Sequence, residues 1–577
     1  MGVPGFFAWL LRKYRKTQIL LLPKEVLLNT HIDILYIDAN CLFHPQCFKV
    51  ISDNTNETDI EILEKKMFVE INKYILYLES IILPREYVYI CVDGVAPLAK
   101  IRQQRNRRYK TVHDTKIYDE MKQKYNKETK NIWSNIVISP GTNFMEKLHQ
   151  SILNNKKFKN KTKYIYSSYH SAGEGEHKIL QHIKKLGSNK NIVVYGLDAD
   201  LIFLTMTIKN HNMFLLREHE IFKHFDNTNN NKTDMICVSI EKLKFAYNNE
   251  IKQLFRNNSF NNIDFIDDFI FLCFLLGNDF LPHFPSIDIM KEGLEYILEA
   301  YVKIYKQIRQ PIINKQTNEL NVVFIILLFE ELGSKEEKYF RYVEPQYKKQ
   351  NNNKICYKQD KYEIELWELE NMKGNNMKLG LGQGTEKEWK NVYYKHYFNI
   401  DINNIKEIDN ICAAYLKSIV WVYHYYFNNC SDWQFQYIFS HAPFISDIAK
   451  YITTNKININ EYKFDIKPPV SIMAQLISII PPAHVHLIPE NYINLVINPA
   501  SKIHHLFPSI IKIDTLNKDI YWKCEAIIPY LDINKILEEI KDIKLSKFEF
   551  KKNRVEDPYL LWMPKQFYKI YNKHLLL

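Results

Sequence analysis

The most informative part of the sequence runs from residue 170 to residue 204. It begins with HSAGEGEHKIL (170–180) and, after a basic spacer, ends with NIVVYGLDADLIFL (191–204). Its four acidic residues form two pairs, each with one residue between: Glu174 and Glu176, then Asp198 and Asp200. Two pairs of solvated surface acids are the alternative, but apolar residues frame the second pair on both sides, which a surface loop does not need. Carboxylates this close repel one another unless a cation lies among them, and Mg²⁺ and Mn²⁺ select such hard oxygen ligands.

Further apolar runs with β-favouring residues resemble the run that precedes Asp198. They span residues 32–37, 87–92 and 164–168, and helical patterns at 60–80 and 143–153 lie between them. The first run ends on Asp38 and the second on Asp93. Such alternation of strands and helices predicts an α/β fold with a largely parallel sheet. Ligands of open α/β sheets bind outside the carboxyl ends of the strands, so we expect these acids to meet there.

A seventh acid follows the apolar stretch 267–276, which reads as a buried helix. The helix pattern stops at Gly277-Asn278, and Asp279 comes next. A helix-capping role is the alternative for this residue. The candidate metal ligands and catalytic acids are then Asp38, Asp93, Glu174, Glu176, Asp198, Asp200 and Asp279. A set of this size fits two Mg²⁺ ions roughly 3.5–4 Å apart that act on a phosphodiester.

A basic run begins directly after Asp93, in DGVAPLAKIRQQRNRRYK (93–110). Helical spacing places four of its polar residues on or near one face: Lys100, Gln104, Arg107 and Arg108. A solvated helix face is the ordinary interpretation of such a run. A basic face beside an acidic metal site, however, is what a phosphodiester substrate requires, because guanidinium groups clamp a phosphate next to the scissile one.

Composition and missing motifs narrow the class of protein. The chain has 577 residues, 46% of them hydrophobic, which suits two or three domains with a sizeable core. A net charge of +11 is weak evidence for nucleic acid by itself. Nine cysteines without a CxxC unit argue for a reducing compartment and against structural zinc. The sequence contains neither a GxxxxGK[ST] loop nor a GxSxG elbow, which disfavours nucleotide hydrolysis and a serine triad.

The second half divides into a weakly patterned stretch and an aromatic-rich one. We expect a nuclease core over residues 1–305, a partly flexible connecting segment over 306–399, and a second region over 400–577 that packs on the core. Aromatic residues are dense between 418 and 447. Most must belong to the core, and one or two at a cleft could stack on bases.

Several motifs in fixed order resemble the XRN-type 5′→3′ exoribonuclease family. They are DAN…H (38–44), the basic run, SPGTNFM at Ser139, AGEGEHKI, GLDADLI and LGNDFLPHFPS. IVWVYHYYFNNCSDWQFQYIFSHAPFISD, MAQLISIIPP and IIPYLDINKILEEI resemble the family's second conserved region, in the same order. The resemblance covers nearly the whole chain.

The resemblance implies a PIN/flap-endonuclease-like core with a largely parallel twisted sheet, and a mainly helical second region. It makes the seven acids ligands, or near neighbours, of two Mg²⁺ ions, with Mn²⁺ able to substitute. It assigns Lys100, Gln104, Arg107 and Arg108 to a pocket for a 5′-monophosphate. It matches His44 to the histidine that stacks on the first base, and Trp433 lies in the region that supplies an aromatic partner.

The expected function is processive 5′→3′ degradation of single-stranded RNA with a 5′-monophosphate, releasing nucleoside 5′-monophosphates. The alternatives are a structure-specific 5′ flap DNA nuclease and a catalytically inactive RNA-binding scaffold. We expect a compact family member without the extra C-terminal domains or the zinc knuckle of other members. We further expect a monomer without membrane association, in a reducing intracellular compartment, with the cytoplasm favoured over the nucleus.

Overall fold

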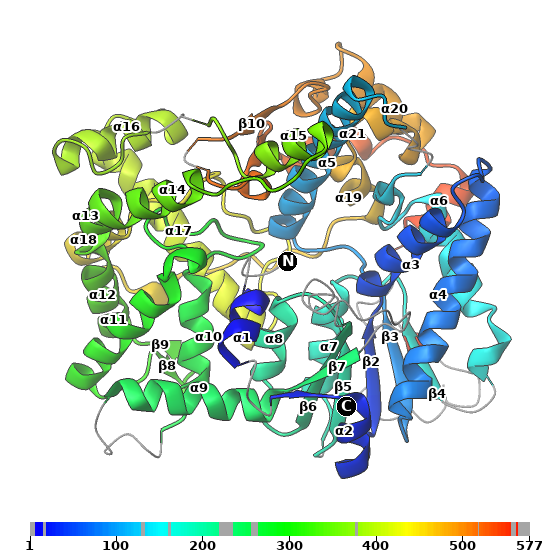
Figure 1. Ribbon diagram of the computed structural model, residues 1–577, viewed down its shortest axis with the longest axis horizontal. Coiled ribbons are helices and arrows are strands. Elements are labelled where there is room, and N and C mark those ends of the chain that lie inside the picture. The colour runs from blue at the N-terminus through cyan, green and yellow to red at the C-terminus, as the bar shows by residue number, and fades with distance from the viewer. Residues whose placement is uncertain are drawn as a thin grey trace.

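The computed structural model describes residues 6–14, 19–128, 133–159, 163–187, 189–218, 235–255, 263–375, 379–516, 518–554 and 561–562. Its centre is an eight-stranded sheet with the strand order β1-β7-β6-β5-β2-β3-β4-β12 (Figure 1). The strands are β1 (Leu20–Leu21), β2 (Ile34–Asp38), β3 (Tyr87–Cys91), β4 (Lys163–Ser167), β5 (Asn191–Tyr195), β6 (Asn212–Glu218), β7 (Met235–Ser239) and β12 (Leu561–Trp562).

Strands β6, β5, β2, β3 and β4 run parallel to one another, which agrees with the predicted largely parallel sheet. In β2, Ile34 is opposite Tyr87 of β3 on one side and Ile192 of β5 on the other, and both pairings are parallel. Strand β4 is parallel to β3, and β6 is parallel to β5. Antiparallel pairs join β7 to β6, β1 to β7 and β12 to β4. The predicted runs 32–37, 87–92, 164–168 and 192–195 therefore correspond to β2, β3, β4 and β5.

Both faces of the sheet are buried, because successive residues of each strand enter two different cores. In β2, Ile34 and Tyr36 belong to one core, and Leu35 and Ile37 belong to the other. The first core includes α7 (Gly175–Lys184), α8 (Asp200–Met206) and α9 (Ile240–Phe255); the second includes α3 (Ala39–Asp53), α4 (Ile60–Ile82) and α6 (Asn143–Leu153) (Figure 1).

The second half of the chain is mainly helical and contributes to both cores. Its helices are α10 (Ile266–Phe274), α11 (Gly293–Ile308), α12 (Val322–Gly333), α13 (Glu336–Lys338), α14 (Glu344–Asn352), α15 (Lys361–Glu370), α16 (Glu386–Phe398), α17 (Ile405–Phe427), α18 (Ile445–Asn455), α19 (Ile472–Ile479), α20 (Glu490–Ile497), α21 (Ile533–Ile540) and α22 (Lys547–Lys552). Helices α17 and α18 pack in the first core, whereas α19 and α21 pack in the second. Helices of the second half therefore pack in the cores on both faces of the sheet.

The stretch 306–399, expected to connect two regions, is largely helical in the structure. Phe324 and Phe329 of α12 and Trp389 and Tyr394 of α16 are buried in the first core. Two short antiparallel pairs complete the fold: β8 (Ile313–Asn314) with β9 (Glu319–Leu320), and β10 (Lys512–Asp514) with β11 (Glu525–Ile527). Among the described residues, none of the helices combines the length and the apolar character that crossing a membrane requires.

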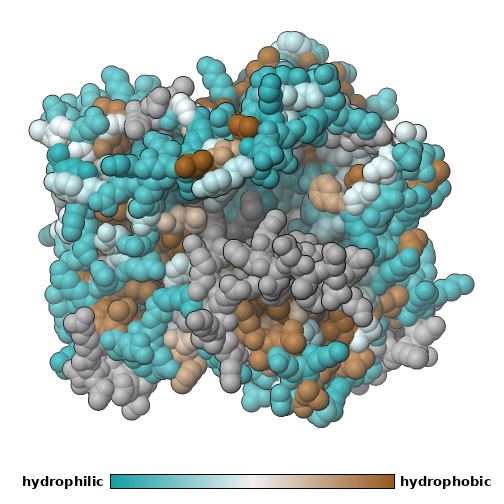
Figure 2. Space-filling model, in the orientation of Figure 1, coloured by the Kyte–Doolittle hydropathy of each residue, from teal (hydrophilic) through white to brown (hydrophobic). Residues whose placement is uncertain are grey.

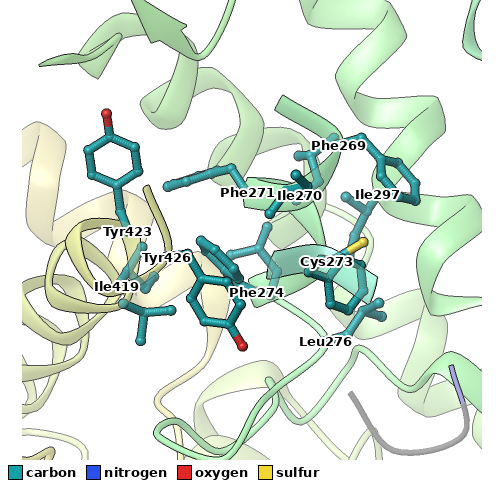
Figure 3. Close-up of a cluster of buried hydrophobic side chains, with 14 of the residues drawn as sticks. Phe269, Ile270, Phe271, Cys273, Phe274, Leu276, Ile297, Ile419, Tyr423 and Tyr426 are labelled. Carbon is teal, nitrogen blue, oxygen red and sulfur yellow. The ribbon is translucent and has the colours of Figure 1, made fainter. Parts of the chain in front are cut away.

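Helix α10 is buried along its whole length, with two aspartates in its first turn and apolar residues after them, because it lies between α17 and the other helices of the first core. Phe274 contacts Tyr426 of α17 with ring centroids 4.8 Å apart, and Phe271 lies 6.5 Å from Tyr423. Figure 3 shows these side chains interleaved, with Ile419 of α17 beside them. This interface joins α17 to α10, the helix that leads to Asp279.

Replacement of Phe274 by alanine should open a cavity in this interface. Phe274 is 3% exposed, so Phe274→Ala should cost about 3–5 kcal/mol of unfolding free energy. Phe245→Ala is the matched control, because Phe245 is 68% exposed and its loss should change stability by about 0.5 kcal/mol or less. Chemical denaturation followed by circular dichroism measures both, and equal losses in the two variants would contradict the assigned packing.

His182 of α7 is buried under the sheet. Its Nδ1 lies 2.6 Å from the Tyr36 hydroxyl, and its ring packs edge-on against Tyr89 at 4.7 Å. Burial, with a smaller effect from the Lys185 charge, lowers the pKa of His182 to about 3. The folded protein therefore holds this ring neutral at pH values where an exposed histidine takes up a proton.

Stability should consequently fall on acidification. A histidine in an unfolded chain has a pKa near 6.5. Between pH 6.5 and about 3, His182 is therefore protonated in the unfolded chain and neutral in the folded protein. Stability is thus complete above this window and decreases as the pH falls through it, by about 1.4 kcal/mol at pH 5.5 from His182 alone. The drop in thermal midpoint from pH 7.5 to 5.5 should be smaller in His182→Gln than in the wild type. The same drop in both proteins would refute the assignment.

Candidate active site

The fold brings the predicted acids to one edge of the sheet. Asp38 is the last residue of β2, Asp93 lies two residues beyond β3, and Asp198 lies three residues beyond β5. These strands are parallel neighbours, so their carboxyl ends meet. The others come from adjoining helix ends: Glu174 and Glu176 at the start of α7, Asp200 at the start of α8, and Asp279 after α10.

Glycines make this close approach possible. A Cβ at Gly175, between the two glutamates, would lie 2.4 Å from Oδ1 of Asp38, and a Cβ at Gly94 would lie 1.8 Å from the Ser171 carbonyl oxygen. The Gly175 backbone N–H donates a 2.7 Å hydrogen bond to Asp93 Oδ1. The glycines of EGE and DG are thus required where the α7 loop meets the ends of β2 and β3.

The acids interact strongly because they are close and largely buried. Burial raises the pKa of Asp38 well above its ordinary value, and the charge of Asp93 adds to this. Burial also raises the pKa of Asp93 to about 6. Burial, followed by the charge of Asp279, raises the pKa of Asp200 to about 7, and Asp200 in turn adds to the effect of burial on the pKa of Glu176. Ionising these four carboxylates is thus costly unless positive charge lies nearby.

Lys100 supplies such a charge inside the cluster. Its Nζ lies 2.5 Å from Glu174 Oε1 and 2.6 Å from Asp279 Oδ2. Burial alone would raise the pKa of Asp279, but the Lys100 charge holds it below the usual range. Gln103 donates a 2.7 Å hydrogen bond to the other oxygen of Asp279. The structure therefore places Lys100 among the acids, and its predicted contact with a 5′-phosphate stays a prediction.

The carboxylate oxygens of the seven acids are chemically suited to bind a divalent cation. In the described part of the chain, no three histidine, cysteine, aspartate or glutamate side chains stand in a geometry ready to hold a metal ion. Two carboxylate oxygens of the cluster, Glu176 Oε2 and Asp200 Oδ1, are nevertheless buried without a hydrogen-bond partner among these residues. Buried unpaired carboxylate oxygens are costly, and a hard cation is the partner that they suit best.

The basic run forms the start of α5 (Leu98–Lys124), and the structure divides its charges among several roles. Arg102 donates to the carbonyls of Tyr437 and Phe439, and Arg105 donates to those of Leu506 and Pro529, so both attach α5 to the second half. Lys110 pairs with Asp114 at 2.7 Å. These three cations of the run are thus engaged in structural contacts.

Arg107 and Arg108 lie on the part of α5 that faces the acids. Arg108 donates to Ser139 Oγ at 2.7 Å, which gives the SPGTNFM motif a role in holding this side chain. Burial and the neighbouring Arg107 charge lower the pKa of Arg108 to about 10, so a bound anion would be favourable there. Arg107 is exposed, whereas Gln104 is half-buried with an Oε1 that lacks a hydrogen-bond partner among the described residues.

The two predicted base-stacking residues approach the site from different sides. Burial, and then the charges of Arg108 and Arg107, lower the pKa of His44 to about 4, so His44 lies near the two arginines and is neutral at pH 7. The Trp433 carbonyl accepts a 2.8 Å hydrogen bond from the N–H of Leu98, the first residue of α5. Its ring lies 6.5 Å from that of His177 in α7.

A cavity of about 380 Å³ adjoins the cluster along α5. Gln103, Asn106 and Arg107 of α5, together with Asp279, form part of its wall. On the face shown in Figure 2 the surface is largely hydrophilic and is hollowed near its centre, close to where α5 begins in Figure 1. The cavity therefore reaches the acidic cluster at Asp279.

Sequence reasoning missed four residues that contact the acids. They are Cys41, whose Sγ donates to Asp38 Oδ2 at 3.0 Å, and Gln103, Tyr425 and Tyr426. Gln103 could have been found, because it neighbours Gln104 in the basic run. The tyrosines carried no such signal, since the sequence places them in a long aromatic segment where core packing is the ordinary role.

Comparison with known proteins identifies the family of this chain. Residues 1–219 match the family described as "XRN 5'-3' exonuclease N-terminus", and residues 259–380 and 350–574 match that described as "Xrn1 helical domain". The chain is 28% identical to "5'-3' exoribonuclease 1" of Homo sapiens over 99% of its own length and 36% of the relative's. It is 26% identical to "5'-3' exoribonuclease 2 homolog" of Drosophila melanogaster, with 97% of this chain and 73% of the relative covered. This chain thus spans about a third of the length of the human relative. The match to the helical-domain model alone covers more than half of this chain, so the chain belongs to the XRN family.

Proposed function

We propose that this protein is a 5′→3′ exoribonuclease that degrades single-stranded RNA with a 5′-monophosphate and releases nucleoside 5′-monophosphates processively. The observation that carries the proposal is the meeting of seven carboxylates at the strand ends, directly beside Arg107, Arg108 and His44. An acidic site suits metal-assisted phosphodiester hydrolysis, and an adjacent arginine pair suits a terminal phosphate. The names of the matched relatives support the direction and the RNA substrate.

The carboxylates would hold two Mg²⁺ ions, with Mn²⁺ able to substitute, as the family implies divalent-metal dependence. When bound, such ions activate the attacking water and stabilise the leaving oxygen of an in-line displacement. Glu176 and Asp200 offer the unpaired oxygens for this role. Lys100 holds Glu174 and Asp279 in fixed positions and offsets part of the charge of the cluster.

The basic end of the site would define the substrate. Arg108, fixed by Ser139, and the exposed Arg107 would receive the 5′-phosphate through forked hydrogen bonds. His44 is neutral, so its ring is suited to stacking on the first base without carrying a charge. An enzyme that grips the 5′ end beside its acids would remove one nucleotide at a time from that end.

We also propose a monomer in a reducing compartment inside the cell, the cytoplasm in preference to the nucleus. All nine cysteines are free thiols in the structure, which supports a reducing environment. A 5′ flap DNA nuclease and an inactive RNA-binding scaffold are the competing functions. The presence of all seven acids argues against the scaffold.

The deciding experiment compares matched RNAs in Mg²⁺. Linear RNA with a 5′-monophosphate should be converted to nucleoside 5′-monophosphates fastest and RNA with a 5′-hydroxyl more slowly, whereas RNA with a 5′-triphosphate and a circular RNA should resist. Fragments from the circular RNA would show endonuclease action and refute the proposal. Preferential cutting of a 5′ flap DNA would favour the flap-nuclease alternative, and binding without cleavage would favour the scaffold.

Loss of one carboxylate should separate hydrolysis from binding. Asp200→Ala removes a buried oxygen that is available to a metal ion. The transition state should lose several kcal/mol of stabilisation, so the rate of RNA hydrolysis should fall to the limit of detection. RNA binding measured by fluorescence anisotropy should change little. Asp542→Ala, at an exposed position, is the control and should keep full activity. Substantial cleavage by Asp200→Ala in Mg²⁺ would contradict the metal assignment.

Loss of one arginine should reveal the 5′-phosphate pocket. Arg107→Ala should lower kcat/KM on 5′-monophosphate RNA by about 10- to 150-fold, because a charged hydrogen bond contributes roughly 1.5–3 kcal/mol. Activity on 5′-hydroxyl RNA, which lacks the phosphate, should change little. Lys116→Ala is the control on the same helix, because Lys116 is an exposed cation more than two turns further along α5. Equal losses on both RNAs would mean that Arg107 merely attracts the RNA backbone.

A further inference from the structure

Helix α17 of the second half ends against the acidic cluster. The Tyr425 hydroxyl donates a 3.2 Å hydrogen bond to Glu174 Oε2. Burial raises the pKa of the next residue, Tyr426, well above its ordinary value, and the charges of Asp200, Glu176 and Asp279 add to this, so its phenol lies near these acids. Two consecutive residues of one helix thus lie beside acids from two different loops, which follow β4 and β5.

Both rings are fixed by packing on their other sides. The Tyr425 ring stacks on His177 at 4.5 Å and on Trp421 at 5.3 Å. The Tyr426 ring packs against Phe274 at 4.8 Å, and Figure 3 shows its hydroxyl pointing out of the apolar cluster. Each tyrosine is therefore a rigid support whose one polar atom faces the acids.

The chemistry of a phenol suits this role. A phenol has an ordinary pKa of about 10, so each hydroxyl keeps its proton at neutral pH and can donate a hydrogen bond. A donated hydrogen bond occupies one oxygen of a carboxylate and fixes the plane of the group. The other oxygen stays available, as Asp200 Oδ1 does.

We propose that Tyr425 and Tyr426 are positioning residues that orient Glu174 and Asp200, so that the helical second half completes the metal site of the nuclease core. The inference rests on the proposed function, because it assigns these carboxylates to metal binding. Groups that hold metal ligands in place typically contribute 10- to 100-fold to metal affinity. If the tyrosines only fill space in the core, their hydroxyls are dispensable.

The test removes single hydroxyls and measures metal binding directly. Tyr425→Phe and Tyr426→Phe keep the ring and its packing, and each should weaken Mn²⁺ binding about tenfold, measured from the electron paramagnetic resonance signal of free Mn²⁺. Tyr423→Phe is the matched control. Tyr423 lies on the same helix, but its hydroxyl donates to the Asn318 carbonyl at 3.0 Å and points away from that of Tyr426 (Figure 3). Its removal should leave Mn²⁺ affinity unchanged.

Kinetics and stability distinguish positioning from packing. In both site variants, kcat at limiting Mg²⁺ should fall and partly recover at high Mg²⁺, while KM for RNA stays the same. Thermal midpoints in EDTA should match those of the wild type. If Tyr426→Phe fails to fold, Tyr425→Phe carries the test alone.

Two failures are separable. A wild-type protein that neither binds Mn²⁺ nor cleaves RNA would overturn the proposed function and this inference together. A wild-type protein that does both, with Mn²⁺ affinity equal in the three tyrosine variants, would overturn the inference and leave the function standing.

Discussion

Electrostatic repulsion at one edge of the sheet is the constraint on which the rest of this structure depends. Parallel strands bring Asp38, Asp93 and Asp198 to the same edge, and burial there raises the pKa of Asp38 and Asp93. The surrounding chain offsets this cost with directed positive charge and hydrogen bonds. The Lys100 ammonium lies between two acids, and the first N–H of α7 donates to Asp93. A site built in this way is ready for divalent cations, since every donor is a hard oxygen.

The second half of the chain packs against both faces of the sheet through buried apolar residues and also reaches the acids. Helix α17 packs in one core and delivers tyrosines to the acids, while α19 and α21 pack in the other core. Arg102 and Arg105 of α5 bind backbone carbonyls of the second half. The nuclease core and the helical half are therefore energetically linked at the site. Looser packing between α10 and α17 would therefore displace Tyr426 and disturb the acids beside it.

The basic helix shows how one sequence feature can serve several purposes. A run of cations beside an acidic motif reads as a single phosphate-binding surface, yet helical geometry sends successive side chains in different directions. Lys100 neutralises the acids, Arg105 anchors the second half, and Arg107 stays exposed. Counting positive charges therefore overstates the number available to substrate.

Sequence patterns predicted strands β2 to β5, the acids and the family, but not strands β1, β6, β7 and β12. The four strands were predictable because short β-branched and aromatic runs are local signals, and the acids because each follows such a run or a glycine break. Only the tertiary structure decided which partners those acids have. Gln103 reaches Asp279 because of the rotation of α5, and Tyr425 reaches Glu174 across about 250 residues of chain. Contacts between distant segments leave no local periodicity, so an aromatic segment looks the same in sequence whether its hydroxyls face an active site or the core.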